Sequence, residues 1–358
     1  MYVNKVLPNK ILNFRRKIID SHVHVGSWNE NGKLKDYTKD IDIFIKTNLE
    51  NGDTIEKLIV SNLDCMAKDS NNHFLFDEYI GNKKILDLAN KNNKIAPLAT
   101  CQPRYGNVEN IVKLFSENPN KFIGFKFHPE QLNLATNNEA YFPYIEFARK
   151  VNLPCLFHSG SSDVSNPSHT YDLAKKFPDV KFIMAHWGAE EGGNYDKVTD
   201  IIIESVKTKN SQIYADISWV DCNNKQKPTL KKIITKLKEE NALDRILFGS
   251  DAPLGRFGGN GENGISPQKA YSELIDDIKN MIKKEFSQEE AEEIINKIFY
   301  KNSEDLFFNK TTPQIVTQNN KITKKSSKTF IWTAVAITFI AGLGLILKNY
   351  NQNNKTDK

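Results

Sequence analysis

Short apolar runs rich in β-branched and aromatic residues alternate with segments of helical periodicity from residue 18 to about residue 300. Eight of these runs have the length and composition of buried strands. They cover residues 17–22, 56–62, 95–101, 122–128, 154–158, 181–186, 212–217 and 245–249. Helical spacing of apolar residues recurs between them, for example over 41–49, 85–89, 111–115 and 233–237, and residues 287–308 are expected to form an additional helix. Eight strand–helix units predict an α/β fold, a (β/α)8 TIM-type barrel rather than an open doubly wound sheet.

The composition changes after residue 308. Residues 309–328 are dominated by Thr, Gln, Asn, Lys and Ser, which is typical of a flexible, polar and basic linker. Residues 329–347 contain no charge, and a helix of that length would span about 28 Å, close to the hydrocarbon thickness of a bilayer. We therefore predict a barrel over residues 1–308, the linker, one transmembrane helix over 329–347 and a short polar tail over 348–358.

The distribution of charge argues against nucleic acid as a partner. The formal net charge is +5, but residues 309–358 contain eight lysines, no arginine and one acid, so the preceding 308 residues carry a charge of about −2. The first ten residues, MYVNKVLPNK, lack the apolar stretch of a signal peptide. More lysines precede the predicted span closely than follow it. We expect a single-pass, C-terminally anchored membrane protein with a cytoplasmic catalytic domain.

Histidines gather at the ends of the predicted strands. His22 and His24 close the first strand, and their spacing of two residues directs both imidazoles to the same side. His158 and His186 end the fifth and sixth strands, and Asp251 follows the eighth. Because the carboxyl ends of barrel strands converge on one face, these side chains are expected to lie together. Neutral imidazoles with one carboxylate suit a divalent metal, Zn²⁺ first, with Mn²⁺ or Fe²⁺ as alternatives.

Six sequence segments between residues 18 and 308 occur in an order that can be compared with known families. They are DSHVHVG, GFKFHP, FHSG, AHWGA, LFGSDAP and, near residue 301, KNSEDLF. Together they resemble the amidohydrolase superfamily, and within it the amidohydrolase-related branch of metal-dependent hydrolases and decarboxylases. The resemblance covers roughly residues 18–308. It implies that His22, His24 and His158 ligate one divalent metal together with Asp251, and that His186 acts near the substrate.

Three further residues are candidates for substrate binding. Lys126, in the fourth strand, can grip a substrate carboxylate, whereas in binuclear relatives the corresponding lysine is carboxylated and bridges two metals; we favour one metal. His128 points to the same side as Lys126, so it is either a substrate contact or a loop histidine held by backbone groups. Arg104, after the third strand, can bind an anionic substrate or form a surface ion pair.

The sequence is best explained by an enzyme acting on a small molecule. The preferred reaction is metal-dependent hydrolysis of a C–O or C–N bond (ester, lactone or amide) by metal-activated water. Asp251 would be both metal ligand and proton acceptor, and His186 would hold an oxyanion or move a proton. A non-oxidative decarboxylase using the same site is the first alternative. A non-catalytic, membrane-tethered binding barrel is the second, and the oligomeric state is left open.

Overall fold

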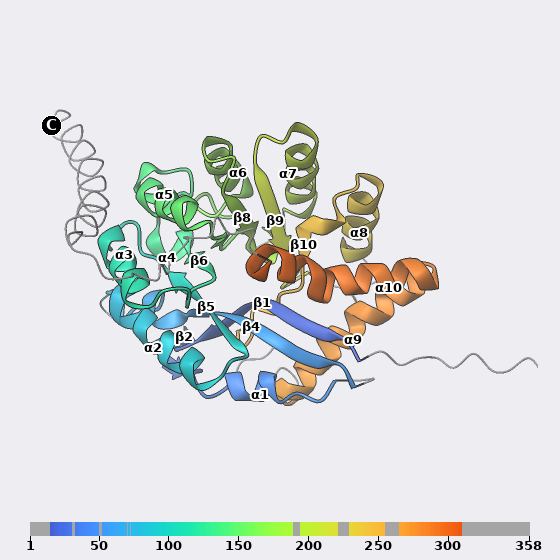
Figure 1. The fold of residues 1–358 in the computed structure, drawn as a ribbon, viewed down its shortest axis with the longest axis horizontal. Coiled ribbons are helices and arrows are strands. Elements are labelled where there is room, and N and C mark those ends of the chain that lie inside the picture. Colours follow the sequence, from blue (N-terminus) through green and yellow to red (C-terminus); the bar gives the residue numbers. More distant parts are fainter. Residues whose placement is uncertain are drawn as a thin grey trace, which may run out of the picture. The chain divides into compact units, whose positions relative to one another are not determined.

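The computed structural model describes residues 15–30, 33–49, 52–69, 71, 73–188, 194–220, 229–254 and 265–309. Eight strands form one parallel sheet in the order β1-β4-β5-β6-β7-β8-β9-β10 (Figure 1). Their bounds are β1 Lys17–Val25, β4 Thr54–Asn62, β5 Ile95–Thr100, β6 Gly124–Phe127, β7 Cys155–Phe157, β8 Lys181–Met184, β9 Gln212–Asp216 and β10 Ile246–Leu247. Each of the eight predicted strands is confirmed.

Backbone hydrogen bonds bring the two ends of the sheet together. The N–H of Ser21 in β1 donates to the carbonyl of Phe248, and the N–H of Asp251 donates to the carbonyl of His22. The first strand therefore meets the segment that follows the last strand, which nearly closes the sheet into a barrel. The predicted TIM-type α/β barrel is confirmed.

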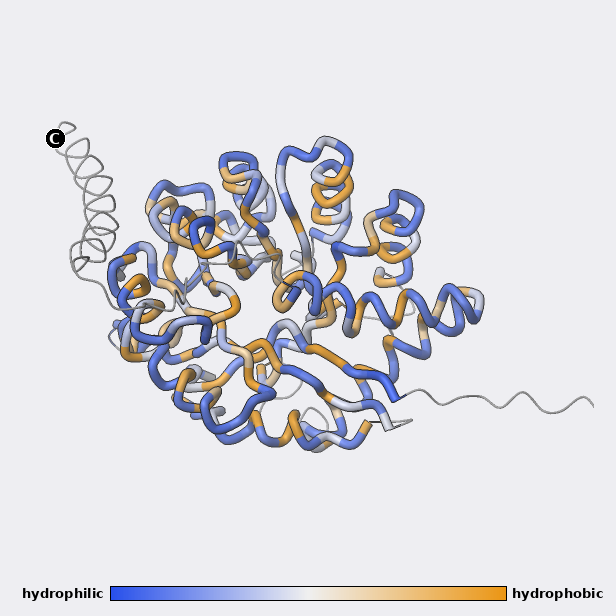
Figure 2. Tube along the Cα trace, viewed as in Figure 1, coloured by the Kyte–Doolittle hydropathy of each residue, from blue (hydrophilic) through white to orange (hydrophobic). Residues whose placement is uncertain are grey.

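Helices cover the outside of the sheet. They are α1 Ile41–Ile45, α2 Glu78–Lys91, α3 Val108–Glu117, α4 Pro129–Leu132, α5 Phe142–Val151, α6 Pro167–Lys176, α7 Tyr195–Thr208, α8 Thr229–Glu239, α9 Pro267–Glu285 and α10 Gln288–Asn296. Hydrophobic positions recur along these helices between hydrophilic ones (Figure 2), as expected for elements that bury one side. After α10 the chain continues in two π-helical turns, Lys297–Lys301 and Glu304–Phe308, so the helical structure expected over 287–308 is confirmed.

One element was not anticipated. An antiparallel hairpin, β2 Ser27–Glu30 and β3 Lys33–Asp36, follows β1 in a region for which the apolar pattern predicts no element. Its sequence is polar and lacks the alternation that marks a half-buried strand.

A cluster of apolar side chains from most of the strands forms the core. Its buried members are Ile19, Ile59, Ala96, Leu98, Leu156, Ile183, Ala185, Leu247, Leu306 and Phe307. Leu306 and Phe307 come from the last π-helical turn, so the segment matching KNSEDLF packs against the barrel core. This packing explains why the chain keeps apolar residues at two successive positions there.

The pairing of β1 with β4 shifts register twice, between Ile18 and Ile19 and between Asp20 and Val23. Side chains alternate across a regular strand, so Ile19 and His22 would face opposite sides. The irregularity allows Ile19 to join the core while His22 and His24 both approach Asp251 in the candidate site described below. Bulges commonly re-aim side chains next to active sites in this way.

No helix among the described residues is long and apolar enough to cross a membrane. The predicted span, residues 329–347, and the tail lie outside the described part of the chain, as does all of the predicted linker except Asn309. The anchor therefore stays a prediction from the sequence.

Candidate metal centre

A cavity of about 220 Å³ lies where the predicted site residues meet. Its walls combine titratable side chains with tryptophan and leucine. The lining residues are His24, Trp28, Leu63, Lys126, His128, His158, His186, Trp219, Asp251 and Leu254.

Three ligand atoms converge beside this cavity. His24 Nε2 lies 3.0 Å and His22 Nε2 lies 3.3 Å from the same oxygen, Oδ1 of Asp251. All three side chains are buried. Two ligands placed about 2.1 Å from a tetrahedral ion lie roughly 3.4 Å apart, so the observed separations fit a single small divalent cation. The structure thus brings His22, His24 and Asp251 together, and these three residues form the candidate metal centre.

Neighbouring groups orient the two imidazoles. His22 Nδ1 lies 3.0 Å from Oδ2 of Asp216, so its N–H donates to that carboxylate and Nε2 keeps the lone pair. His24 Nδ1 lies 2.8 Å from Oγ of Ser61, which can accept its N–H in the same manner. Such outer partners fix the tautomer of metal-binding histidines and increase their basicity.

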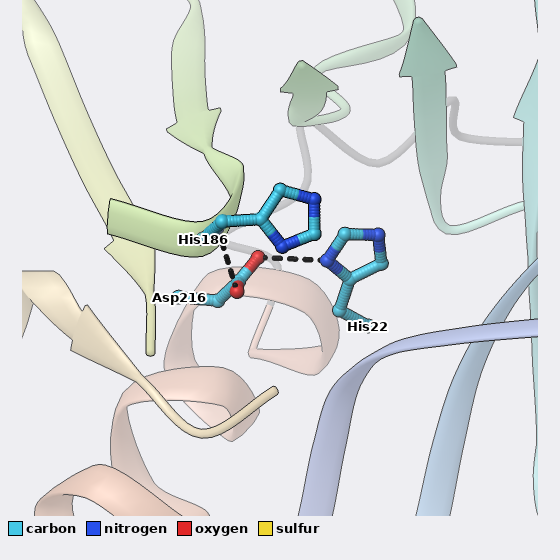
Figure 3. A group of neighbouring side chains, drawn as sticks. All are labelled: His22, His186 and Asp216. Carbon is cyan, nitrogen blue, oxygen red and sulfur yellow. Dashed lines mark hydrogen bonds and ion pairs between the residues drawn. The ribbon is translucent and has the colours of Figure 1, made fainter. Parts of the chain in front are cut away.

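A second group of possible ligands, His22, His186 and Asp216, shares His22 with the first (Figure 3). Asp216 Oδ2 accepts from His22, and Oδ1 accepts the backbone N–H groups of His186 at 3.1 Å and Ser218 at 3.0 Å. Ser218 Oγ also donates to Oδ1. Because these donors already use both oxygens, Asp216 is better suited to orient the histidines than to bind a cation.

The hydrogen bonds around His186 define its tautomer. Ser218 Oγ gives its proton to Asp216, so at 2.8 Å it must accept the N–H of His186 Nδ1. His186 Nε2 then carries a lone pair and lies 3.2 Å from Nδ1 of His158. The other ring nitrogen of His158 lies 3.3 Å from the Glu130 carboxylate. His158 thus lines the same cavity, but among the described residues neither of its nitrogens belongs to a group of three converging ligands.

Burial sets the charge states in the centre. Burial lowers the pKa of His24 to about 4 and the pKa of His186 well below its usual range, because a buried imidazolium is poorly solvated. Burial alone would raise the pKa of Asp251, but the imidazoles of His186, His22 and His24 hold that pKa well below its usual range. A divalent cation binds histidines in their neutral form and carboxylates in their ionised form, and these are the protonation states favoured here.

The three candidate substrate residues have different surroundings. Lys126 is buried with Nζ 2.7 Å from His22 Nε2, so that lone pair can accept from Lys126 or bind a cation, but not both. His128 lines the cavity and stacks on His158 at a centroid distance of 4.0 Å. Arg104 is not among the lining residues, and its guanidinium donates to the carbonyls of Leu132 and Asn133 at 3.3 and 2.8 Å.

Backbone geometry at the strand ends is unusual. His186 and Asp251 have φ values of 60° and 62°, in the left-handed region that side chains other than glycine adopt rarely. Conformations of this kind cluster at functional sites, where the surrounding structure holds them. Close by, a Cβ added to Gly249 would lie 3.0 Å from Cβ of His22 and 3.0 Å from Cβ of Asp216. Glycine at this position lets the ligand and its orienting carboxylate approach each other.

Sequence reasoning missed several parts of the site. The sequence gives little indication of a role for Ser61 or Ser218, because serines are common and neither lies in a nucleophile motif. Two tryptophans that line the cavity were also missed: Trp28 lies in the unexpected hairpin, and Trp219 lies in the segment after β9. A weak signal existed for Ser218, since it follows Asp216 by two residues at the end of the seventh predicted strand.

A family comparison agrees with this arrangement. The profile described as "Amidohydrolase" matches residues 113–308, more than half of the 358-residue chain. The chain belongs to the amidohydrolase family. This membership makes it a metal-dependent enzyme of the amidohydrolase type. The matched part contains His158, His186 and Asp251, whereas His22 and His24 precede it.

Solved structures of amidohydrolases and related enzymes share the fold. A probable 2-pyrone-4,6-dicarboxylic acid hydrolase from Acinetobacter baumannii, with citric acid bound, has a TM-score of 0.54 at 17% identity, covering 81% of this chain and 98% of that one. An amidohydrolase from Burkholderia multivorans with bound zinc has a TM-score of 0.55 at 13% identity, with 81% and 98% coverage. The IDCase of Metarhizium anisopliae in its apo form has a TM-score of 0.51 at 14% identity, covering 81% and 97%. No curated protein sequence matches the chain.

Proposed function

We propose that the protein is a metal-dependent hydrolase that cleaves a C–O or C–N bond (ester, lactone or amide) in a small molecule. The observation that carries the proposal is the convergence of His22 Nε2, His24 Nε2 and Asp251 Oδ1 beside the cavity. His158, which lines the same cavity, is the proposed fourth ligand because the family resemblance implies it. Zinc is the proposed metal, supported by the donor set and by the zinc in the Burkholderia multivorans amidohydrolase.

A divalent ion held there would supply Lewis acidity, bringing the pKa of a bound water toward neutrality and polarising a carbonyl. The chain's own residues would manage the protons. Asp251 carries a negative charge at the metal centre and is the proposed general base. His186 carries a lone pair on Nε2, because Ser218 accepts the proton of Nδ1, so His186 suits proton acceptance better than donation to an oxyanion.

The cavity favours a compact substrate with an acidic group. A volume of about 220 Å³ admits a molecule of modest size. Lys126 places an amino group on the wall of the cavity. Trp28 and Leu63 provide apolar surface there. We propose that Lys126 binds a substrate carboxylate, with His128 as a neighbouring contact.

Non-oxidative decarboxylation is the second candidate function. Lys126 Nζ and the proposed metal ligand His22 are only 2.7 Å apart, so one substrate carboxylate could contact the lysine and the metal together. That arrangement would hold the group that a decarboxylase releases as CO2. Hydrolysis remains the preferred proposal because Asp251 and His186 provide two proton acceptors beside the ligands.

The test is a screen of metal-loaded enzyme against lactones, esters, amides and aromatic acids in ¹⁸O-labelled water. A hydrolase places labelled oxygen in the organic product, whereas a decarboxylase releases CO2 and leaves the organic product without label. Asp251→Asn should lower turnover by about 10²–10⁴-fold, the usual contribution of a general base. Near-native turnover of this variant on the true substrate would exclude Asp251 as the base.

We also propose that residues 329–347 anchor the enzyme to a membrane. The support is the uncharged stretch itself and the lysines on either side of it.

A further inference from the structure

Trp219 lies just after β9, at the mouth of the cavity. Its side chain is 47% exposed, although tryptophan is among the residues that gain most from burial. The indole Nε1–H donates to Oδ2 of Asp251 at 2.8 Å, and the ring approaches His186 edge to face at a centroid distance of 6.4 Å. A large apolar residue is thus held partly in solvent by contacts with two proposed catalytic residues.

This hydrogen bond divides the two oxygens of Asp251 between different partners. Oδ1 lies 3.0 Å from His24 Nε2 and 3.3 Å from His22 Nε2, in the candidate metal centre. Oδ2 accepts the indole N–H of Trp219. A carboxylate restrained in this way can offer a cation one oxygen only, because rotation that would bring Oδ2 into the centre breaks the bond to Trp219.

The backbone conformation of Trp219 supports a functional reason for its placement. Its φ is 65°, in the left-handed region, where a bulky residue is a true outlier. That conformation is unfavourable for a residue with a side chain, and a half-exposed side chain recovers little of its cost by burial. Among the described residues, the hydrogen bond to Asp251 is the contact that uses the N–H at this position, and it needs a donor with the reach of an indole.

We propose that Trp219 is a positioning residue for Asp251: its indole N–H binds one lone pair of Oδ2, so that the carboxylate faces the metal through Oδ1 and keeps the second lone pair of Oδ2 for its role as general base. The inference rests on the proposed metal-dependent function for its consequence, but the hydrogen bond itself can be measured without metal. Partners that orient metal ligands typically contribute about 10–100-fold to metal affinity or activity. Loss of the indole N–H should have an effect of that size.

The decisive variant is Trp219→Phe in the full-length protein, since phenylalanine keeps an aromatic ring but has no N–H. Trp28→Phe is the matched control, because Trp28 lines the same cavity and no hydrogen bond joins it to Asp251 among the described contacts. Thermal unfolding of both variants checks that they fold. The first readout is the indole N–H resonance in metal-free protein, which Trp219→Phe identifies among the four tryptophans.

We expect that resonance to be protected from solvent exchange and to move in Asp251→Asn, which weakens the acceptor. Rapid exchange, with no response to Asp251→Asn, would overturn the proposal. This arm is independent of catalysis, so the absence of metal binding by the wild type would refute the proposed function and leave the hydrogen bond measurable.

The second readout is the dissociation constant for Zn²⁺ and the visible spectrum of the Co²⁺-loaded protein. Trp219→Phe should weaken metal binding or lower kcat by about 10–100-fold and should change the Co²⁺ spectrum, while Trp28→Phe should change neither the affinity nor the spectrum. If Trp219→Phe keeps the native affinity, spectrum and kcat and raises only KM, Trp219 is a wall of the cavity and the proposal is wrong.

Discussion

Gly249 is the residue at which the site leaves no room for a side chain. A Cβ there would meet Cβ of both His22 and Asp216 at 3.0 Å, tighter than ordinary van der Waals contact. Gly249→Ala should therefore push the ligand away from its orienting carboxylate. We expect a loss of stability of about 1–3 kcal/mol, typical of overpacking, and metal binding weaker by at least about 10-fold.

Chemical denaturation and a metal-binding titration of the same preparation check this prediction. If Gly249→Ala binds metal as tightly as the wild type, the close approach of His22 and Asp216 is not required.

At the scale of single residues, the order of the strands was enough to predict which candidate ligands lie close together. His22 and His24 lie near the carboxyl end of β1 and Asp251 follows β10, and barrel topology brings such ends together whatever the loops do. The roles of Asp216 and Trp219 could not be predicted, because each depends on the distance to a side chain in another strand or loop. Arg104 follows a strand as the others do, but its side chain turns to the carbonyls after α4.

Among the helices and loops, Glu78 at the start of α2 joins several segments. Its carboxylate accepts the backbone N–H groups of Gln102 and Asn107 at 2.9 and 2.8 Å and the hydroxyl of Tyr144 at 3.0 Å. Burial raises the pKa of Glu78 from 4.5 to about 7. The folded protein therefore holds a proton on this group between pH 4.5 and 7 that the unfolded chain has released.

Under this linkage the free energy of unfolding falls as pH rises through that window. We predict that the wild type loses about 2 kcal/mol between pH 5 and pH 7.5 relative to Glu78→Gln, whose amide does not titrate. Urea denaturation of both proteins at the two pH values measures the difference. Parallel pH profiles would show that Glu78 ionises in the folded protein as it does in the unfolded chain.

The elements themselves were predictable to different degrees. All eight barrel strands were found because strands covered on both faces read as continuous apolar runs. The polar hairpin β2–β3 has no such signal, and it is stabilised by its own backbone pairing. The shift of register in β1 could not be predicted either. Residues on both faces of this strand are buried, so the sequence does not show where the side chains change face.

At the scale of the whole molecule, the orientation of the predicted anchor can be tested. Lys321, Lys324, Lys325 and Lys328 precede the span closely, whereas Lys348, Lys355 and Lys358 follow it together with Asp357. The balance of +4 against +2 favours the barrel on the cytoplasmic side. Protease added to intact cells or organelles should then spare the barrel and reach at most the residues after 347. Digestion of the barrel with protection of the tail would show the reverse orientation.

The central claim is that His22, His24 and Asp251 hold a divalent metal, and metal analysis of purified variants tests it most directly. The wild type should contain about one equivalent of Zn²⁺ or Mn²⁺. His22→Ala should lose nearly all of it, because it removes one of the three converging ligand atoms. His73→Ala is the matched control, since the His73 side chain is 80% exposed and does not line the cavity, and it should keep the native metal content. Full occupancy in His22→Ala, or loss of metal from both variants alike, would contradict the account.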